Sequence, residues 1–349
     1  MLLTIIATIF VIGVLVFIHE LGHFLVAKWA GIRVDKFSLG FPPTLVSRRW
    51  GETIYAVGVI PLGGFVKMAG ENPDEETTGE PWEFMSKPVW KRALVIAAGP
   101  LMNFFLAILV LAGLYFVRGK DIDQVVVGTV LPDRPAAQAG IIPDDTIIAI
   151  DNTPVSSFAE MAEIISQKIE EPVIVTWKSD DILKTDTLIT FRGYNPRPAG
   201  DSVAVGQIGI GGKIVYRRLG PIRAIAAGFS QSLFYVKMVA EFVWGLISQK
   251  SDPREIGGPI LIGQLAGITV RAGFDILLEF LALLSVNLAV VNILPIPVFD
   301  GGHLVFLTVE KLKGSPLSLQ ARIIAQQIGI VFIIIFFIFV TFNDIARWF

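Results

Sequence analysis

The chain has 349 residues, of which 53% are hydrophobic and only 17% charged, and its mean hydropathy is +0.65. This composition is too apolar for an ordinary soluble enzyme of that length and predicts an integral membrane protein. The net charge of −2 gives no reason to expect a nucleic-acid partner. The chain has no cysteine, which excludes disulfides, thiolate metal sites and cysteine nucleophiles.

Four segments are long and apolar enough to cross a bilayer as helices, which takes about 20 residues. They run over about 2–30, 93–117, 274–294 and about 323–342. The first could pass for a signal peptide, but it has no basic start and no obvious small-residue cleavage site, so we expect a retained span. Residues 219–250 mix charged and apolar side chains, which favours an interfacial helix over a fifth span.

Basic residues predict the orientation of these spans. They cluster between the first two spans and recur at Lys311, Lys313 and Arg322, before the fourth. Because cytoplasmic loops are enriched in Lys and Arg, residues 31–92 should face the cytoplasm and the N-terminus the outside. Arg118 and Lys120, which follow the second span, disagree but are outnumbered.

Inside the first apolar segment stands the sequence His19-Glu20-Leu21-Gly22-His23. Two histidines four residues apart project from one face of a helix and can share one ion. Glu20 beside them can accept a proton from a water, as in HExxH metalloproteases. The alternative is a chance match with histidines in ordinary core hydrogen bonds. Polar residues in an apolar span are costly and usually mark a site, which favours zinc.

The third ligand must come from elsewhere in the chain, and the end of the third apolar segment offers two candidates. Pro295 and Pro297 cannot continue a helix, so the backbone must open there. Asp300 follows the break and should lie at the depth of the histidine pair. His303, one turn further on, is the competing ligand. A carboxylate beside the membrane without a positive partner is otherwise hard to explain, which favours Asp300 and leaves His303 a supporting role.

Residues 37–67, between the first two spans, are rich in glycine and β-forming residues and predict strands or a hairpin. An apolar sheet edge beside a membrane site could pair with an extended peptide. A hairpin that only packs on the helices fits the sequence equally well.

From about residue 123 to residue 192 the composition becomes that of a soluble module. We predict strands at 125–131, 145–150, 173–178 and 185–191, and helices at 135–140 and 157–168. The result is a compact outer module of about 70 residues, which is a common size for a small domain.

With these features in view, the chain resembles the site-2 protease family of intramembrane zinc metalloproteases, in its bacterial regulator-of-sigma-E protease branch. The resemblance spans nearly the whole chain, and the family's usual Leu-Asp-Gly reads Phe299-Asp300-Gly301 here. It rests on HELGH at 19–23, GGFVKMAGE at 63–71, AAGPLMNF at 97–104, GGPI at 257–260 and NILPIPVFDGG at 292–302.

The resemblance implies roles for individual residues. His19, His23 and Asp300 would bind Zn²⁺, and Glu20 would activate water. Asn292 would bind the substrate backbone. The hairpin, with Gly63, Gly64 and Phe65, would hold the substrate extended.

The resemblance also implies substrates, location and architecture. The substrates would be single-pass membrane proteins of the anti-sigma type and remnant signal peptides, cut in the bacterial inner membrane. The active site would face the cytoplasm, and an outer PDZ domain would restrict access to it.

The expected fold is therefore a polytopic α-helical membrane protein with four transmembrane helices, a membrane-associated β-hairpin and an inserted α+β PDZ domain. Its parts would be an N-terminal membrane half (1–122), the PDZ domain (123–193), a linker with interfacial helices (194–272) and a C-terminal membrane half (273–349). A rival function is a metal transporter or PDZ scaffold with a structural zinc, which has no evident need for Glu20.

Overall fold

The computed structural model describes residues 1–71, 78–122, 124–196 and 202–347. The chain divides into two compact units, which we describe separately. Unit 1 comprises Met1–Tyr115 and Gly220–Phe349, and unit 2 comprises Phe116–Leu219. Residue 123, the expected start of the outer module, lies outside the described residues, as do residues 197–201 of the expected linker.

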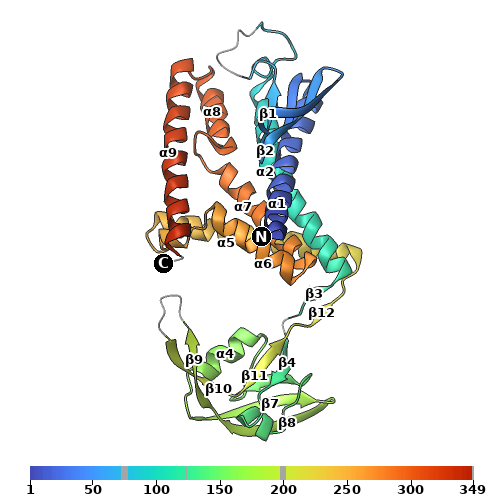
Figure 1. Cartoon of the computed structure of the whole chain (residues 1–349), viewed down its shortest axis with the longest axis vertical. Helices are drawn as coiled ribbons and strands as arrows, with labels where there is room; N and C mark the ends of the chain where they lie inside the picture. Colours follow the sequence, from blue (N-terminus) through green and yellow to red (C-terminus); the bar gives the residue numbers. More distant parts are fainter. Residues whose placement is uncertain (72–77, 123, 197–201, 348–349) are drawn as a thin grey trace. The chain divides into compact units, whose positions relative to one another are not determined.

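Unit 1 is mostly helical (Figure 1). Four of its described helices are long and apolar enough to cross a membrane: α1 (Leu2–Trp29), α2 (Val89–Val117), α7 (Phe274–Ile293) and α9 (Leu319–Ala346). The other helices are α5 (Pro221–Ile247), a 3₁₀ turn at Pro253–Glu255, α6 (Pro259–Ala272) and α8 (Asp300–Lys313). The four expected spans agree with the four long helices, and α5 is not among them. Helix α6 lies within residues 194–272, where interfacial helices were expected, but its own bounds were not predicted.

Helices α1 and α2 come into close contact at two glycines, Gly22 of α1 and Gly99 of α2. A Cβ at Gly22 would collide with the Ala98 carbonyl oxygen of α2, and a Cβ at Gly99 would collide with His23 Nε2. Only hydrogen side chains allow the two backbones this close. The histidine face of α1 is therefore covered by α2.

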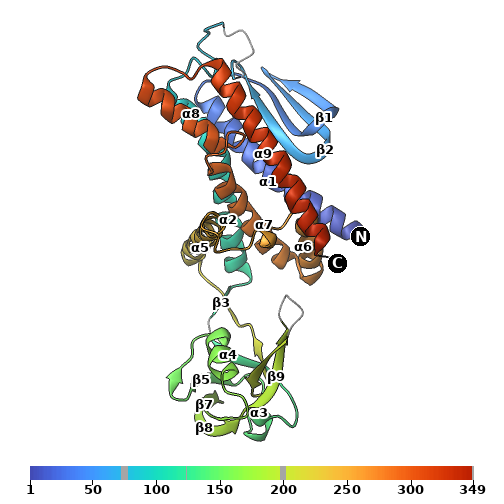
Figure 2. The same ribbon diagram turned by 90° about the vertical axis from the view of Figure 1, so that its left-hand side faces the viewer.

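Strands β1 (Val34–Trp50) and β2 (Thr53–Met68) form an antiparallel hairpin with several register shifts. The hairpin lies beside α1, as Figures 1 and 2 both show. Within it, a Cβ at Gly63 would collide with the Phe41 ring, so the strands pack too closely at this point for any larger residue. The strands expected at 37–67 are thus present as one hairpin against the first span.

The chain opens between α7 and α8, as the two prolines predict. Helix α7 ends at Ile293, and α8 starts at Asp300. A Cβ at Gly301 would collide with carbonyl oxygens of Ile293 and Leu294, so the new helix folds tightly back on the break. This turn fixes the position of Asp300 at the first residue of α8.

Near the C-terminal end of α9, the buried carboxylate of Asp344 binds the N-terminal end of α6. Its carboxylate accepts hydrogen bonds from the backbone N–H groups of Gly258, Ile260 and Leu261, at 2.9 to 3.0 Å. An anion at a helix N-terminus satisfies free N–H groups and opposes the helix dipole. This contact ties α9 to α6.

Unit 2 contains mainly strands. Its main sheet has the order β11-β4-β5-β7-β8, with β6 paired to β5. The sheet strands are β4 (Val125–Val130), β5 (Thr146–Ile150), β6 (Thr153–Pro154), β7 (Pro172–Ser179), β8 (Ile182–Ile189) and β11 (Ile210–Lys213). Two further pairs are β9 (Phe191–Pro196) with β10 (Ser202–Gln207) and β3 (Lys120–Asp121) with β12 (Tyr216–Arg217). The helices are α3 (Pro135–Gln138) and α4 (Phe158–Ser166).

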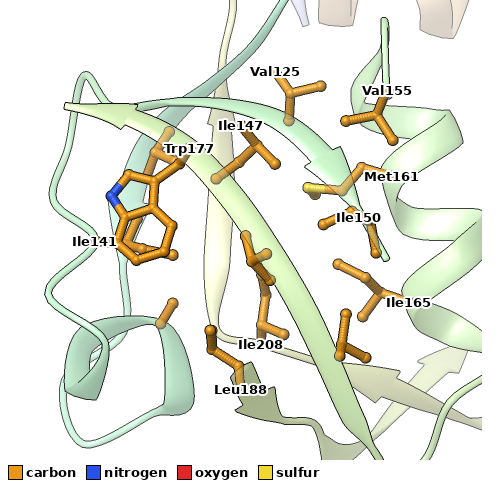
Figure 3. Close-up of a cluster of buried hydrophobic side chains, with 14 residues drawn as sticks. Val125, Ile141, Ile147, Ile150, Val155, Met161, Ile165, Trp177, Leu188 and Ile208 are labelled. Carbon is orange, nitrogen blue, oxygen red and sulfur yellow. The ribbon is translucent and has the colours of Figure 1, made fainter. Parts of the chain in front are cut away.

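The core of unit 2 lies between the sheet and α4 (Figure 3). Ile147 and Trp177 from the sheet are almost fully buried, and Met161 and Ile165 come from α4. Every strand and helix expected between 125 and 191 has a counterpart within a few residues. The strands β9 to β12 were not foreseen, and unit 2 extends beyond the expected range of 123–193.

Candidate metal centre

Three of the four residues expected at the centre meet in unit 1. Ligand atoms of His19, His23 and Asp300 all lie within 4.8 Å of one another, and within the described residues no other group of this kind was found. The Nε2 atoms of the two histidines are 3.2 Å apart. Asp300 Oδ2 is 3.1 Å from His19 Nε2, and Asp300 Oδ1 is 3.6 Å from His23 Nε2. Asp300, rather than His303, stands with the histidine pair.

The hydrogen bonds of the trio suit a cation. His23 Nδ1 lies 2.8 Å from the Val95 carbonyl oxygen. A carbonyl only accepts, so Nδ1 carries the hydrogen and the lone pair of Nε2 is free. That lone pair faces His19 and Asp300, and Asp300 Oδ2 is buried without a hydrogen-bond donor. Two imidazole nitrogens and a carboxylate that converge at these distances can share a cation, and this nitrogen and oxygen set is one that zinc uses.

His19 is held from α2 as well. Asn103 Nδ2 lies 3.2 Å from His19 Nδ1, while Asn103 Oδ1 is buried without a partner in the described structure. Amide nitrogen and oxygen exchange places on a half-turn of the side chain. That turn would bring Oδ1 to accept from His19 Nδ1–H, which would satisfy Asn103 and free Nε2 for a metal. Asn103 is itself fixed, because Ser285 Oγ donates to its backbone oxygen at 2.7 Å.

The trio lines a cavity of about 330 Å³. Of the other predicted site residues, Glu20, Phe65 and Asn292 also line it, whereas Gly63 and Gly64 do not. A Cβ at Gly64 would lie 3.2 Å from Glu20 Cγ, so β2 passes directly over the proposed base. Glu20 of α1, the hairpin and the end of α7 thus border the same cavity. His303 lines the same cavity.

Glu71 is a cavity residue to which the sequence analysis gave no role. Burial raises the pKa of its carboxyl to about 7, although the Met68 backbone N–H donates to it at 3.3 Å. Glu71 lies in the segment GGFVKMAGE, so the family resemblance pointed to its neighbourhood but not to its burial.

Three more charged residues of the cavity were also missed. Arg92 from α2 binds Glu310 from α8 through both guanidinium Nη atoms, at 3.1 and 2.5 Å, and Arg322 from α9 stands beside them. Arg92 and Glu310 are 218 residues apart in the chain. Their charges are visible in the sequence, but no periodicity connects residues at that separation.

The grouping of two histidines on one helix, an adjacent glutamate and a distant aspartate in an apolar helical unit fits a zinc peptidase of the membrane. Comparison with known families agrees: the model of peptidase family M50 matches residues 7–336. The chain belongs to this family, the site-2 protease family, and is a zinc-dependent peptidase of the membrane.

Individual relatives cover the whole length of the chain. A protein of Rhizobium meliloti (strain 1021), named as a candidate zinc metalloprotease, is 34% identical over 97% of this chain and 95% of its own length. The regulator of sigma-W protease RasP of Bacillus subtilis (strain 168) is 28% identical over 99% of both chains. Among solved structures, a PDZ domain of an SdrC-like protein from Listeria monocytogenes covers 27% of this chain and 88% of its own, with 26% identity and a TM-score of 0.21, too low to define the fold of unit 2.

Proposed function

We propose that this peptidase cuts peptide bonds within transmembrane segments, with zinc held by His19, His23 and Asp300 and with Glu20 as general base. The observation that carries the proposal is the convergence of the three ligand atoms within 4.8 Å, in a cavity that Glu20 also lines. Zinc in such a site polarises a carbonyl and lowers the pKa of water to about 7. Glu20 takes the proton from the attacking water and passes it to the leaving amine.

The hairpin supports a role in holding the substrate. A peptide bond inside a transmembrane helix is shielded by the helix's own hydrogen bonds, so the segment must be unwound before it is cut. Pairing with a strand edge replaces the bonds that unwinding breaks. Strand β2 passes over Glu20 at Gly64 and places Phe65 in the cavity, and Asn292 of α7 lines the same cavity. We assign backbone binding to Asn292 and to the segment that contains Gly63, Gly64 and Phe65.

The proposed substrates are single-pass membrane proteins, such as anti-sigma factors, and remnant signal peptides. One relative is named as a regulator of a sigma-factor pathway, which supports the first class. The rival function, a transporter or scaffold with a structural zinc, gives no role to Glu20 at the cavity wall.

One experiment tests the function directly. Purified protein should contain about one zinc per chain, as the three-ligand site requires, and should cut a model transmembrane peptide at bonds that mass spectrometry locates. A chelator should abolish cleavage and added zinc should restore it. Zinc without cleavage across a panel of transmembrane peptides would favour the rival function.

We also propose that the protein lies in the bacterial inner membrane with residues 31–92 and the metal centre toward the cytoplasm and with the N-terminus and unit 2 outside. The basic residues beside the spans support this orientation. The chain has no cysteine, so single cysteines report cleanly. Cysteines at the exposed positions Ser47 and Thr187 should react with a membrane-impermeant reagent from opposite sides. Reaction of both from one side would contradict it.

We infer that unit 2 is a PDZ domain that controls access to the metal centre. The order of strands and helices supports the assignment, with α4 packed on a sheet of short strands. Such a domain could exclude substrates with bulky outer domains, or it could capture new C-termini through backbone N–H groups. Both modes remain open.

The pairing of β3 with β12 suggests how to separate these two modes. Lys120 lies opposite Arg217, and the Ile122 N–H donates to the Val215 oxygen at 3.0 Å, so the chain enters and leaves unit 2 at one place. Residues 123–214 can therefore be replaced by a short Gly-Ser linker. New cleavage of untrimmed substrates supports exclusion, and slower cleavage of trimmed substrates alone supports capture.

A further inference from the structure

Helix α9 carries two charged residues that are buried, and they differ in their partners. Asp344 accepts three backbone hydrogen bonds from the start of α6. Arg322, in the first turns of the same helix, is buried for all but 17% of its side chain. Burying a charged group in an apolar helix costs free energy, so such a group is generally paired with an opposite charge or a backbone group. The hydrogen bonds of Asp344 satisfy its charge, whereas Arg322 is much less well satisfied.

Among the described residues, the acid within ion-pair distance of Arg322 is Glu310, and it is already occupied. Arg92 holds both its carboxylate oxygens, at 3.1 and 2.5 Å, in the two-point geometry that makes such pairs strong. Arg322 Nη2 is 3.9 Å from Glu310 Oε2, which is beyond hydrogen-bond distance. Two guanidinium groups therefore share one carboxylate. One positive charge is left without a matching negative one in this cluster.

The remaining donors of Arg322 are poorly used. Its Nη1 makes one long contact of 3.8 Å with the Met85 sulfur, a weak acceptor. Its Nε is buried and has no acceptor among the described residues. A buried guanidinium whose hydrogen-bond donors are poorly satisfied is unfavourable, so an acceptor from outside the chain would gain by binding here.

The guanidinium of Arg322 lines the cavity where we place the substrate. Arg322 and Gln326, one turn apart on α9, line the same cavity as Asp300 and Glu20. Figures 1 and 2 both show α8, which starts at Asp300, beside α9. A polypeptide in the cavity can therefore reach Arg322 without leaving the site.

We propose that Arg322 forms an anion subsite of this cavity that binds a carboxylate of the substrate polypeptide. The planar fork of arginine fits a carboxylate, and a polypeptide has no other common anionic group. The carboxylate comes from one of two sources: an Asp or Glu side chain near the cleaved bond, or the new C-terminus formed by cleavage. The proposal rests on the proposed function, since it assumes that the cavity receives a peptide.

The first arm of the test uses pairs of transmembrane substrates that differ only by Asp or Asn at successive positions near the cleaved bond. The wild type should prefer the Asp form at one position by about tenfold in kcat/KM, the effect of one charged hydrogen bond. Arg322→Gln should lose that preference mainly through KM. Lys311→Gln, at an exposed position of α8 outside the cavity, should keep it.

The second arm measures equilibrium binding and needs no turnover. Peptides that end at the cleaved bond carry either a free carboxylate or an amide. If the new C-terminus is the ligand, the wild type should bind the acid form about tenfold more tightly and Arg322→Gln should bind both alike. Acid and amide versions of the Asp and Asn peptides distinguish the two sources.

The outcomes separate this proposal from the proposed function. A wild type that cuts nothing would overturn the function, while the binding arm would still decide the subsite. If Arg322→Gln keeps every preference of the wild type, the subsite does not exist. If it weakens both members of each pair equally, with a lower melting temperature, Arg322 is structural and the proposal is wrong. Absence of any acid preference in the wild type also overturns it.

Discussion

The two units differ in how many polar and charged side chains they bury: among the described residues, twelve such side chains are buried in unit 1 and three in unit 2. The core cluster of unit 2 consists of hydrophobic residues, such as Ile147 and Trp177. In unit 1, only 11% of the apolar window of α9 is buried, yet Asp344 on that helix is 2% exposed. Water drives apolar side chains together in unit 2. Lipid gives no such drive, so contacts in unit 1 depend on close glycine packing and on polar groups that find partners.

Each unit should therefore be sensitive to a different kind of substitution. Removal of a buried methyl group should matter most in unit 2, where the core provides stability. Removal of a buried charge should matter most in unit 1, where charges define the metal centre and connect the helices.

The largest effect should come from Asp300→Ala, which removes one of the three proposed metal ligands. We expect loss of zinc and of cleavage, because two histidines alone make a weaker and more open site. His303→Ala is the matched control, since His303 lines the cavity but lies outside the trio. Metal analysis of both variants decides the point. Zinc retained in Asp300→Ala and lost in His303→Ala would reverse the ligand assignment.

Glu20→Gln should separate metal binding from catalysis. The three ligands remain, so zinc content should stay near that of the wild type. Cleavage should fall by about 10² to 10⁴-fold, the usual contribution of a general base. Single-turnover rates together with metal analysis measure both quantities. A variant that keeps most of its activity would remove Glu20 from the proposed mechanism.

Asp300 and Glu20 also show what could be predicted from the sequence. Polar side chains in unit 1 are informative because they stand against an apolar background, so His19, Glu20, His23 and Asp300 could be found one by one. Their meeting could be inferred from the depth of each span. The residues that orient these side chains could not be predicted from the sequence. Val95, for example, accepts a hydrogen bond from His23 through its backbone oxygen, a group that every residue carries.

Contacts between residues that are far apart in the chain could not be predicted from the sequence either. Arg92 and Arg322 were used only as signs of orientation, whereas in the structure both stand by Glu310. In unit 2 the alternation of apolar residues identified β4, β5, β7 and β8. The strands β9 to β12 are short and contain several glycines, so their hydrophobic pattern was too weak to detect.

The third prediction tests the core of unit 2. Ile147 is 1% exposed and its neighbour Ile148 is 39% exposed on the same strand. Ile147→Ala should destabilise unit 2 by about 2–5 kcal/mol through lost burial and a cavity, and Ile148→Ala by about 0.5 kcal/mol or less. Hydrogen exchange of β5 and β7 amides in the full-length protein measures both. Zinc content should stay unchanged, and equal effects of the two variants would contradict the assigned core.

The smallest effect concerns a charge in unit 2, at Asp151. Lys168 donates to its carboxylate at 2.5 Å and the Ile174 N–H at 2.9 Å, and these bonds lower the pKa of Asp151 below its usual value. A carboxyl whose pKa is lower in the folded state stabilises the fold above its unfolded pKa. The stabilisation is lost as pH falls through the folded pKa.

Asp151→Asn should therefore destabilise unit 2 by about 1 kcal/mol at neutral pH, a figure reduced for solvent screening of a partly exposed pair. The difference from the wild type should shrink below the unfolded pKa of about 3.9, because the wild-type carboxyl then gains its proton too. Hydrogen exchange at β7, corrected for the intrinsic pH dependence of exchange, follows it. The exposed Asp180→Asn is the control and should change little at any pH. A destabilisation by Asp151→Asn that persists undiminished in acid would mean that the side chain acts through its shape and hydrogen bonds, with its charge contributing nothing.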